Sequence, residues 1–343
     1  MTGVQTCALP IYTIKKAVQI YKQLAADRPV AFKSDFARSL KSLSNNLSDL
    51  GQKEEALNTI KKAVQIYQQL SADRPVAFKS NLALSLNSLS NHLSGLGQKE
   101  EALNAIKKAV QIRQQLAADR PVAFNSDLAC SLNNLSNCLF VLDQKEEALN
   151  AIRNAVQIHE QLAVNGPAVF NSYFAGSLNN LSNCFSGLGQ KEEALNAIKK
   201  AVQIYKQLAA DRPAAFNSNL GLCLNSLSNF LFDLGQREEA LIAIKNVLQI
   251  YQQLAADRLP AVFNSDFAYS FNNLLYHLSN LGQKDEAINA IKEAVQICQQ
   301  FASDRPTAFN SDFTCSLNQL SNCLFNNKNH NPESFQETKQ IYQ

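Results

Sequence analysis

The stretch that decides the fold is residues 29–74, "PVAFKSDFARSLKSLSNNLSDLGQKEEALNTIKKAVQIYQQLSADR". Its opening proline recurs every 46 residues, and the interval before Pro260 is 47 because Leu259 is inserted: Pro29, Pro75, Pro121, Pro167, Pro213, Pro260 and Pro306. A second marker, "LGQKEEAL" at Leu50–Leu57, returns with small changes at the same period. Such self-similarity is the signature of a repeat architecture.

Each unit has the pattern of two helices. The first half carries apolar residues at steps of three and four, which trace one face of a helix: Phe32, Phe36, Leu40, Leu43, Leu47 and Leu50. Proline suits the first turn of this helix, since its missing N–H would be unpaired there, and Gly51 ends it. The second half carries Ala56, Leu57, Ile60, Ala63, Val64, Tyr67 and Leu70 before "ADRP" closes the unit. We expect two antiparallel helices of roughly 20 residues, about 30 Å each.

Length and composition favour stacked units. The chain has 343 residues, more than one core of about 250–300 residues accommodates, whereas repeats bury apolar surface only against their neighbours. The net charge of +3 is too small to indicate nucleic acid or an anionic membrane as partner. No apolar run long enough to span a bilayer occurs. Eight cysteines without CxxC pairs, and no secretory signal, favour a reducing, cytoplasmic setting.

The pattern resembles the tetratricopeptide repeat (TPR). With Gly51 as the turn glycine, six residues fall on the large and small signature positions of that motif: Leu40, Leu43, Leu47, Ala56, Ile60 and Ala63. The resemblance covers residues 12–325, about seven helix pairs, and implies an all-α, right-handed superhelical solenoid. The unit is 46 residues long instead of 34, as in the long repeats of kinesin light chain, which carry a similar "LNNLA" string. Similar arrays also form the sensor regions of larger multidomain proteins.

The two ends depart from the repeat. Ile11–Gln23 align with Leu57–Gln69, and Pro10 falls where the signature alanine belongs, a position at which proline costs about 3 kcal/mol. We therefore expect residues 1–11 to be a non-native leader resembling translated sequencing-adapter read-through. Residues 326–343 read as a degenerate second helix, or a polar cap of the kind that solenoids require.

Asparagines recur on one face of the first helices, although asparagine is a poor helix former. The resemblance implies that these helices line a concave groove, so the asparagines predict two parallel rows along it. The two rows contain Asn45, Asn87, Asn91, Asn133, Asn137, Asn179, Asn183, Asn225, Asn229, Asn272, Asn318 and Asn322. Lys41 replaces asparagine once in the first row, and Tyr276 replaces it once in the second row. A carboxamide can pair with a backbone C=O and N–H together. An extended peptide is the expected ligand, unless the asparagines bond across neighbouring helices and only stiffen the solenoid.

Residues beside the rows vary from unit to unit, and these are the expected determinants of specificity: Arg38, Leu84, Cys130, Phe140, Leu222, Phe232 and Tyr269. An acidic edge would favour a ligand with some positive charge: Asp35, Asp127, Asp266 and Asp312. Four or five engaged asparagines predict micromolar affinity, about −8 kcal/mol.

No catalytic or metal constellation emerges, and we expect neither cofactor nor enzymatic activity. One position of the first helices carries histidine or cysteine in several repeats: His92, Cys138, Cys184, His277 and Cys323. Zinc needs ligands that converge on one ion, which residues in successive repeats do not do. We therefore expect these residues to fill the junction between helices. The leading hypothesis is a scaffold that binds a protein segment. A regulatory arm or self-associating spacer of a larger protein remains open, and RNA binding is disfavoured because the groove lacks stacking aromatics and distributed basic residues.

Overall fold

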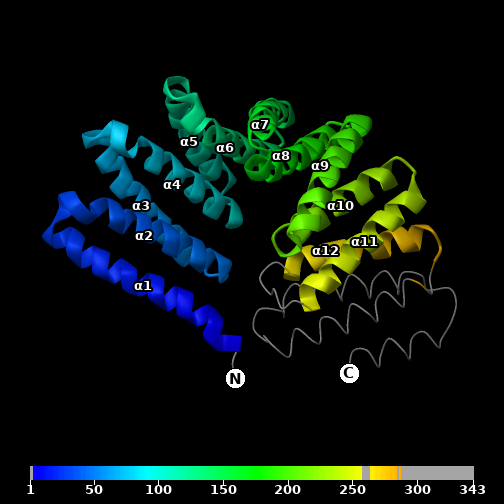
Figure 1. Ribbon diagram of the computed structural model, residues 1–343, viewed down its shortest axis with the longest axis horizontal. Helices are drawn as coiled ribbons and strands as arrows, with labels where there is room; N and C mark the ends of the chain where they lie inside the picture. The colour runs from blue at the N-terminus through cyan, green and yellow to red at the C-terminus, as the bar shows by residue number, and fades with distance from the viewer. Residues whose placement is uncertain (1–2, 257–262, 284–285, 287–343) are drawn as a thin grey trace. The chain divides into compact units, whose positions relative to one another are not determined.

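The computed structural model describes residues 3–256, 263–283 and 286 of the chain. Every regular element in these ranges is an α-helix, as the repeat pattern predicts (Figure 1). The helices are α1 (Gly3–Asp27), α2 (Pro29–Asp49), α3 (Lys53–Asp73), α4 (Pro75–Gly95), α5 (Lys99–Asp119), α6 (Pro121–Val141), α7 (Lys145–Asn165), α8 (Pro167–Gly187), α9 (Lys191–Asp211), α10 (Pro213–Asp233), α11 (Arg237–Ala256) and α12 (Phe263–Asn280).

The helix ends follow the sequence signals. Proline occupies the first turn of α2, α4, α6 and α8, which confirms the predicted starts. Gly51 adopts a φ of +77° after α2, and the equivalent glycines of other units are similar. The N–H of Gln52 returns to the carbonyl of Leu47 at 2.9 Å, which satisfies an end-of-helix acceptor. Glu54 and Glu55 lie in the first turn of α3, where carboxylates favour the helix dipole.

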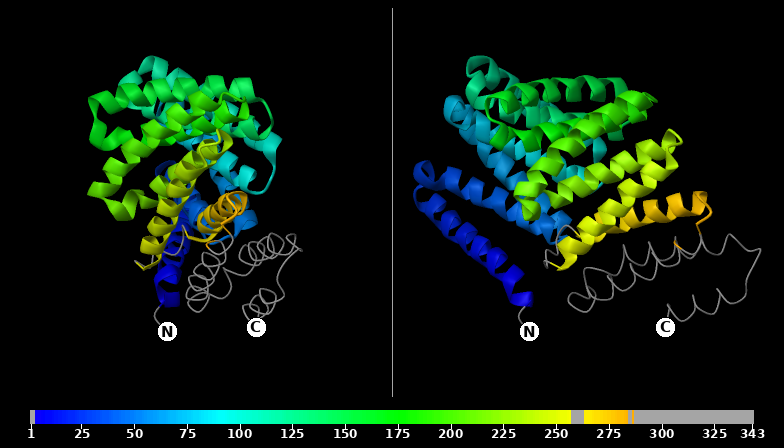
Figure 2. Two further views of the ribbon diagram at one scale, coloured as in Figure 1. Left: turned by 90° about the vertical axis from the view of Figure 1, so that its right-hand side faces the viewer. Right: turned by 45° about the vertical axis from the view of Figure 1, so that its right-hand side comes forward.

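The chain divides into two compact units at Arg212, each described here by itself. In the first unit, α1 to α9, every helix packs against the next along the chain. The first helices α2, α4, α6 and α8 also contact one another across repeats, which places them on the more closely spaced, inner side of this unit (Figures 1 and 2). In the second unit, α10 packs on α11 and also contacts α12.

The predicted signature positions form the core. Ala56 and Ile60 are both fully buried, and so are their equivalents in the next four repeats: Ala102, Ile106, Ala148, Ile152, Ala194, Ile198, Ala240 and Ile244. Leu40, Leu43 and Leu47 are also buried. Small residues at every crossing let the paired helices approach closely, and large residues fill the space between pairs.

The N-terminal helix is longer than the repeat alone predicts. Helix α1 begins at Gly3 and passes through Pro10, so it crosses the boundary expected at residue 11. From Ile11 onward it follows the repeat, because Ile11, Ile14 and Val18 pack on a cluster of buried residues from α2 and α3. The predicted cap, residues 326–343, and the groove residues Asn318 and Asn322 lie outside the described residues.

Two glycines in one turn give a matched test of the backbone account. Gly97 has a φ of +74°, whereas Gly95 is the last residue of α4, and a Cβ at either would meet no atom within 4 Å. Gly97→Ala should lower the free energy of unfolding by about 1 kcal/mol, because a side chain is strained in left-handed backbone. Gly95→Ala should raise it by roughly 0.5 kcal/mol. Denaturant unfolding measures both, and equal effects would contradict the assigned turn.

Candidate binding groove

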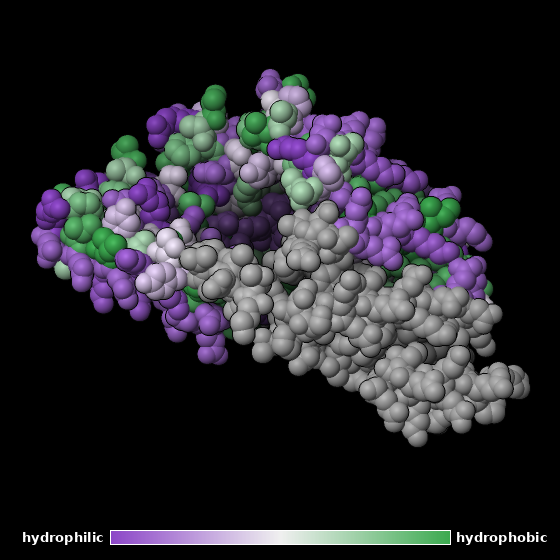
Figure 3. Space-filling model, turned by 60° about the horizontal axis from the view of Figure 1, so that its bottom comes forward, coloured by the Kyte–Doolittle hydropathy of each residue, from purple (hydrophilic) through white to green (hydrophobic). Residues whose placement is uncertain are grey.

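The inner face of the first unit carries the predicted residues in two rows. We call this face the groove; its first row is Lys41, Asn87, Asn133 and Asn179, and its second row is Asn45, Asn91, Asn137 and Asn183. The first row is half-buried, and the second is exposed except for half-buried Asn183. In the second unit, Asn225 is buried, while Asn229 and Asn272 are half-buried. In Figure 3, hydrophilic side chains cover much of the surface that the view shows, with hydrophobic ones scattered between them.

Some of these asparagines connect neighbouring repeats. The Ser131 hydroxyl of α6 donates to Asn87 Oδ1 of α4 at 3.2 Å, and Asn134 Nδ2 donates to Asn91 Oδ1 at 3.4 Å. In the second unit, Asn273 Nδ2 donates to Asn225 Oδ1 at 3.0 Å. These three asparagines therefore stiffen the stack, which is the structural alternative that the sequence left open.

Two adjacent members of the first row differ from these. The Oδ1 atoms of Asn133 and Asn179 are buried and have no hydrogen-bond partner in the protein. A buried acceptor without a partner costs about 1–3 kcal/mol. Each oxygen is inaccessible to solvent as placed, so a ligand N–H would reach it only after the side-chain amide rotates.

The variable residues beside the rows do not all face open space. Phe140 of α6 lies against Gly187 of α8, where a Cβ would come within 2.5 Å of its ring. Phe232 packs against Tyr276 and His277, with ring centroids 5.1 and 4.5 Å apart. Both phenylalanines therefore contact the next repeat. The side chain of Tyr269 lies outside the described residues.

Three of the variable residues are exposed, and one is half-buried. Arg38, Leu84 and Leu222 are exposed, whereas Cys130 is half-buried with its Sγ 4.0 Å from His159 Nε2. Burial raises the pKa of the Cys130 thiol above its ordinary value, and nearby Asp127 adds to this while Arg113 opposes it. The thiol is therefore protonated near neutral pH.

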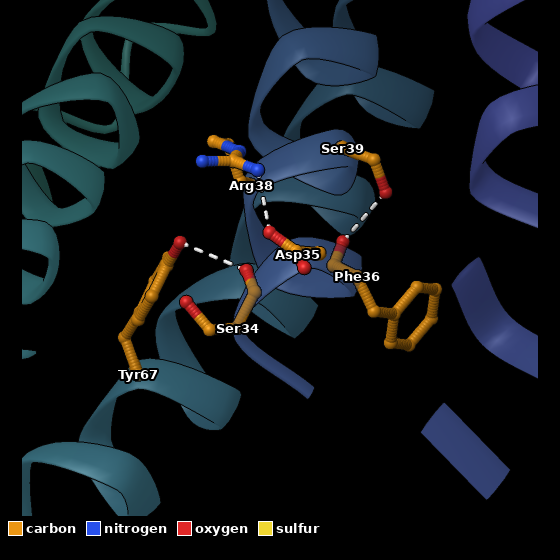
Figure 4. Close-up of polar contacts among 6 residues, drawn as sticks. All are labelled: Ser34, Asp35, Phe36, Arg38, Ser39 and Tyr67. Carbon is orange, nitrogen blue, oxygen red and sulfur yellow. Dashed lines mark hydrogen bonds and ion pairs between the residues drawn. The ribbon is translucent and has the colours of Figure 1, made fainter. Parts of the chain in front are cut away.

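Two carboxylates of the expected acidic edge lie close to cations in the first unit. Asp35 forms an ion pair with Arg38, one turn along the same helix, so its charge is matched (Figure 4). Asp127 lies beside Arg113, which carries a charge of opposite sign. The side chain of Asp266 and all of Asp312 lie outside the described residues.

A polar position in the second helices, which sequence reasoning passed over, lies directly beneath the groove. The Tyr67 hydroxyl reaches back and donates to the Ser34 carbonyl at 3.1 Å (Figure 4), and Tyr205 does the same to Ser172 at 2.9 Å. Arg113 and His159 stand at the same position in the repeats between. The change of residue type at a constant 46-residue spacing was the signal that could have identified this position.

Arg113 and His159 contact the first helix of the following repeat, whereas Tyr67 and Tyr205 contact the first helix of their own repeat. Arg113 Nη1 donates to the Asp127 carbonyl and, at 2.7 Å, to Ser131 Oγ, both in α6. His159 Nδ1 lies 2.8 Å from Ser177 Oγ in α8. Two central repeats of the first unit thus have a polar, titratable layer under the groove where the flanking repeats have tyrosine.

The buried guanidinium of Arg113 lacks a carboxylate partner. The residue is 2% exposed, no ion pair to it occurs among the described residues, and its Nε has no hydrogen-bond partner. Burial lowers the pKa of Arg113, and the nearby charge of Asp127 partly opposes this. Burial also lowers the pKa of Lys41, and the Arg113 charge lowers it further.

The stacked histidines and cysteines bond to serines of the preceding repeat. Ser44 Oγ lies 3.3 Å from His92 Nε2, and the equivalent contacts are Ser90 to Cys138 at 3.5 Å, Ser136 to Cys184 at 3.4 Å and Ser228 to His277 at 2.8 Å. Each pair joins two first helices. Within the described ranges, no three His, Cys, Asp or Glu side chains lie close enough to hold a metal ion.

Burial of His159 makes stability depend on pH. Burial lowers the pKa of His159 from 6.5 to about 4. Between those values the unfolded chain binds a proton that the folded chain does not, so stability falls as the pH falls from 6.5 towards 4. At pH 5 the loss is about 2 kcal/mol.

His159→Tyr provides the comparison, because tyrosine stands at the equivalent positions 67 and 205. Denaturant unfolding at pH 7 and pH 5 should show a smaller loss for the variant by about 2 kcal/mol. The other buried histidines are common to both proteins and cancel. Parallel pH profiles would contradict the assigned burial.

Comparison with known proteins agrees with the fold. Two solved structures share it: BtubC (BKLC) from P. vanneervenii, with a TM-score of 0.57, 16% identity and coverage of 72% of this chain and 92% of that one, and a Podospora anserina putative kinesin light chain with nearly identical TPR-like repeats, with a TM-score of 0.50, 23% identity and coverage of 66% and 98%. No curated protein sequence matches the chain. No helix in the described part is long and apolar enough to cross a bilayer.

Family models match most of the repeats. A model for anaphase-promoting complex subunit 5 matches residues 255–321. The tetratricopeptide-repeat model matches five segments: residues 36–74, 82–119, 128–165, 174–212 and 220–257. Tetratricopeptide repeats generally form non-enzymatic scaffolds for protein interaction, and no enzymatic family is indicated. The chain belongs to the tetratricopeptide-repeat family.

Proposed function

We propose that the protein is a scaffold whose groove binds an extended segment of a partner protein through the amides of its asparagine rows. The observation that carries this is the pair of buried, unpartnered Oδ1 atoms at Asn133 and Asn179. They belong to adjacent repeats and to the same row, so a single strand crossing α6 and α8 can pair with both amides once each side chain turns its oxygen towards the strand. An extended strand has the required donors, because its backbone N–H groups have no partner of their own.

The two rows are polar, and this favours an extended peptide as the ligand and disfavours a partner helix. A helix docks through apolar residues at i, i+3, i+4 and i+7, and such a ligand needs a hydrophobic groove. Here the first and second rows present amides, and the two phenylalanines beside them pack on neighbouring repeats. Amide pairing with backbone supplies affinity that is independent of ligand sequence, and the exposed Arg38 and Leu84 supply selection.

Stability separates the binding amides from the structural ones. Asn133→Ala and Asn179→Ala remove an unpartnered acceptor and should leave the free energy of unfolding unchanged or raise it by about 0.5 kcal/mol, since alanine is the better helix former. Asn225→Ala removes the acceptor of the Asn273 amide and should lower it by about 1 kcal/mol. Chemical denaturation measures each, and a loss of stability for all three variants would assign every asparagine to the scaffold itself.

A binding measurement on the same variants tests whether these two amides contact a ligand. An array of random peptides should retain the intact protein, and the double variant Asn133→Ala with Asn179→Ala should bind about tenfold more weakly or not at all. The matched control is Asn104→Ala with Asn150→Ala, two exposed asparagines on the second helices α5 and α7. Equal binding by both double variants would contradict the proposal.

Self-association is a second candidate, favoured by the outer face of α1. Tyr12 and Ile20 of α1 are 67% and 47% exposed, and Tyr21 is half-exposed, whereas its equivalent Tyr67 is buried between repeats. Sedimentation at several protein concentrations tests this candidate. A mass that rises with concentration, and stays constant in Tyr12→Ser, would support assembly through α1; a constant monomer mass would exclude it.

A further inference from the structure

A cysteine and a histidine face each other in the middle of the first unit. The Sγ atom of Cys130 in α6 lies 4.0 Å from Nε2 of His159 in α7. The histidine is 2% exposed, and its other ring nitrogen, Nδ1, lies 2.8 Å from the Ser177 hydroxyl of α8. Thiolate sulfur and imidazole nitrogen are both ligands of soft metal ions. The two side chains are therefore a candidate pair of metal ligands.

The pair stands where two variable positions of the repeat meet, 29 residues apart. The same positions meet in the next repeat, where a Cβ at Gly176 would lie 3.4 Å from the Tyr205 hydroxyl. Arginine, leucine or glycine occupies the first position of the other described helix pairs, and tyrosine or arginine occupies the second: Arg38 with Tyr67, Leu84 with Arg113, Gly176 with Tyr205, and Leu222 with Tyr251. Of the helix pairs that the structure describes, α6 and α7 alone carry soft ligands at both positions.

The separation of the two atoms leaves room for an ion between them. Bonds of about 2.3 Å to sulfur and about 2.0 Å to nitrogen, the lengths that zinc makes, hold the ligand atoms about 3.5 Å apart at a tetrahedral angle and about 4.3 Å apart in a straight line. The observed 4.0 Å lies between these limits. The two atoms are therefore spaced for an ion that binds both at a wide angle.

The number of ligands restricts the metal. In the described part of the chain, no group of three His, Cys, Asp or Glu side chains is close enough to hold an ion. Zinc takes at least three protein ligands, so this pair does not suit it. Copper(I) is soft, prefers sulfur and imidazole nitrogen, and forms stable complexes with two ligands at a wide angle. A soft monovalent ion is thus the kind of metal that fits.

The charge of such a complex suits its surroundings. A thiolate and a monovalent cation are together neutral, so binding adds no net charge to a partly desolvated place. The charges of Arg113 and Asp127, which both act on the Cys130 thiol, are opposite in sign. Cys130 is half-buried, unlike Cys138 and Cys184, so solvent reaches part of this residue.

We propose that Cys130 and His159 form a two-ligand site for a soft monovalent metal ion, with copper(I) as the ion that fits best. On binding, the Cys130 S–H bond breaks, its proton passes to the buffer, and the thiolate sulfur and His159 Nε2 each donate an electron pair to the ion. The tautomer with its hydrogen on Nδ1 leaves Nε2 free for the metal. The Ser177 oxygen is placed to accept that hydrogen, as partners of metal-binding histidines do. The site does not depend on the proposed peptide binding.

Nitrogen-15 labelling of histidine in the full, reduced chain tests the inference directly. The chain has four histidines, and His159→Tyr assigns the resonances of one, since tyrosine stands at the equivalent positions 67 and 205. Copper(I), added without oxygen, should shift Nε2 of His159 to saturation and leave its Nδ1 protonated. If every histidine nitrogen stays in place while copper(I) binds the thiols of the chain, the Cys130–His159 contact is a hydrogen bond and the inference is overturned.

Cysteine variants separate this site from the other thiols. Cys130→Ser should abolish the shift of His159 Nε2, because a hydroxyl is a poor ligand for a soft ion. Cys138→Ser, the same change at a buried cysteine that contacts Ser90, is the matched control and should leave the shift unchanged. Ser177→Ala should raise the copper(I) concentration at half-saturation about tenfold, since the imidazole loses its partner at Nδ1. A full shift in Cys130→Ser would overturn the inference.

Two further measurements fix the class of ion and keep the two proposals apart. Excess zinc should not displace copper(I) from His159; displacement that depends on Cys130 would make this a zinc site and overturn the inference. The double variant Asn133→Ala with Asn179→Ala should bind copper(I) as the intact chain does. Loss of peptide binding in that variant, and loss of the metal in Cys130→Ser, are therefore separate results.

Discussion

The close contact between a serine of the first helix and the signature alanine of its partner helix, seen in three repeats, is the constraint on which the stack depends. The hydroxyls of Ser90, Ser136 and Ser228 each donate at 2.8 Å to the carbonyl of the alanine that follows twelve residues later. Both residues of each pair are fully buried. A larger side chain at either place would separate the two helices, so the contact fixes the distance within a pair. The same serines then touch the histidine or cysteine of the next repeat, which links pair to pair.

This constraint separates what must repeat from what is free to vary. The leucine, isoleucine and alanine positions are nearly identical in every unit because each buries the same surface. On the inner face and in the layer beneath it the residues change: lysine or asparagine in the first row, and tyrosine, arginine or histidine beneath it. These changes alter the polar contacts of single repeats, while the core positions stay the same.

The fold was predictable from the sequence because the same pattern of apolar and polar residues recurs every 46 residues. The roles of single asparagines were not, since they depend on neighbours in another repeat. Asn87 and Asn133 occupy the same position in almost the same string, yet only Asn87 accepts a bond from the next serine. Arg113 can only donate, so Ser131 accepts from it and turns its own hydrogen to Asn87. One repeat later His159 contacts Ser177, and the Asn133 oxygen is left unpartnered. The surroundings of the expected acidic edge also depend on single residues, since Asp35 pairs with Arg38 one turn away.

The central claim is that the groove amides of Asn133 and Asn179 meet a ligand. Side-chain amide resonances of the protein labelled with nitrogen-15 asparagine, assigned by single Asn→Ala changes, test it directly during titration with a peptide that the random array retains. The account predicts that the amides of Asn133 and Asn179 shift together and saturate with the peptide, while those of Asn104 and Asn150 on the second helices stay in place. Unmoved resonances at Asn133 and Asn179 with peptide bound, or larger shifts at Asn104 and Asn150, would contradict it.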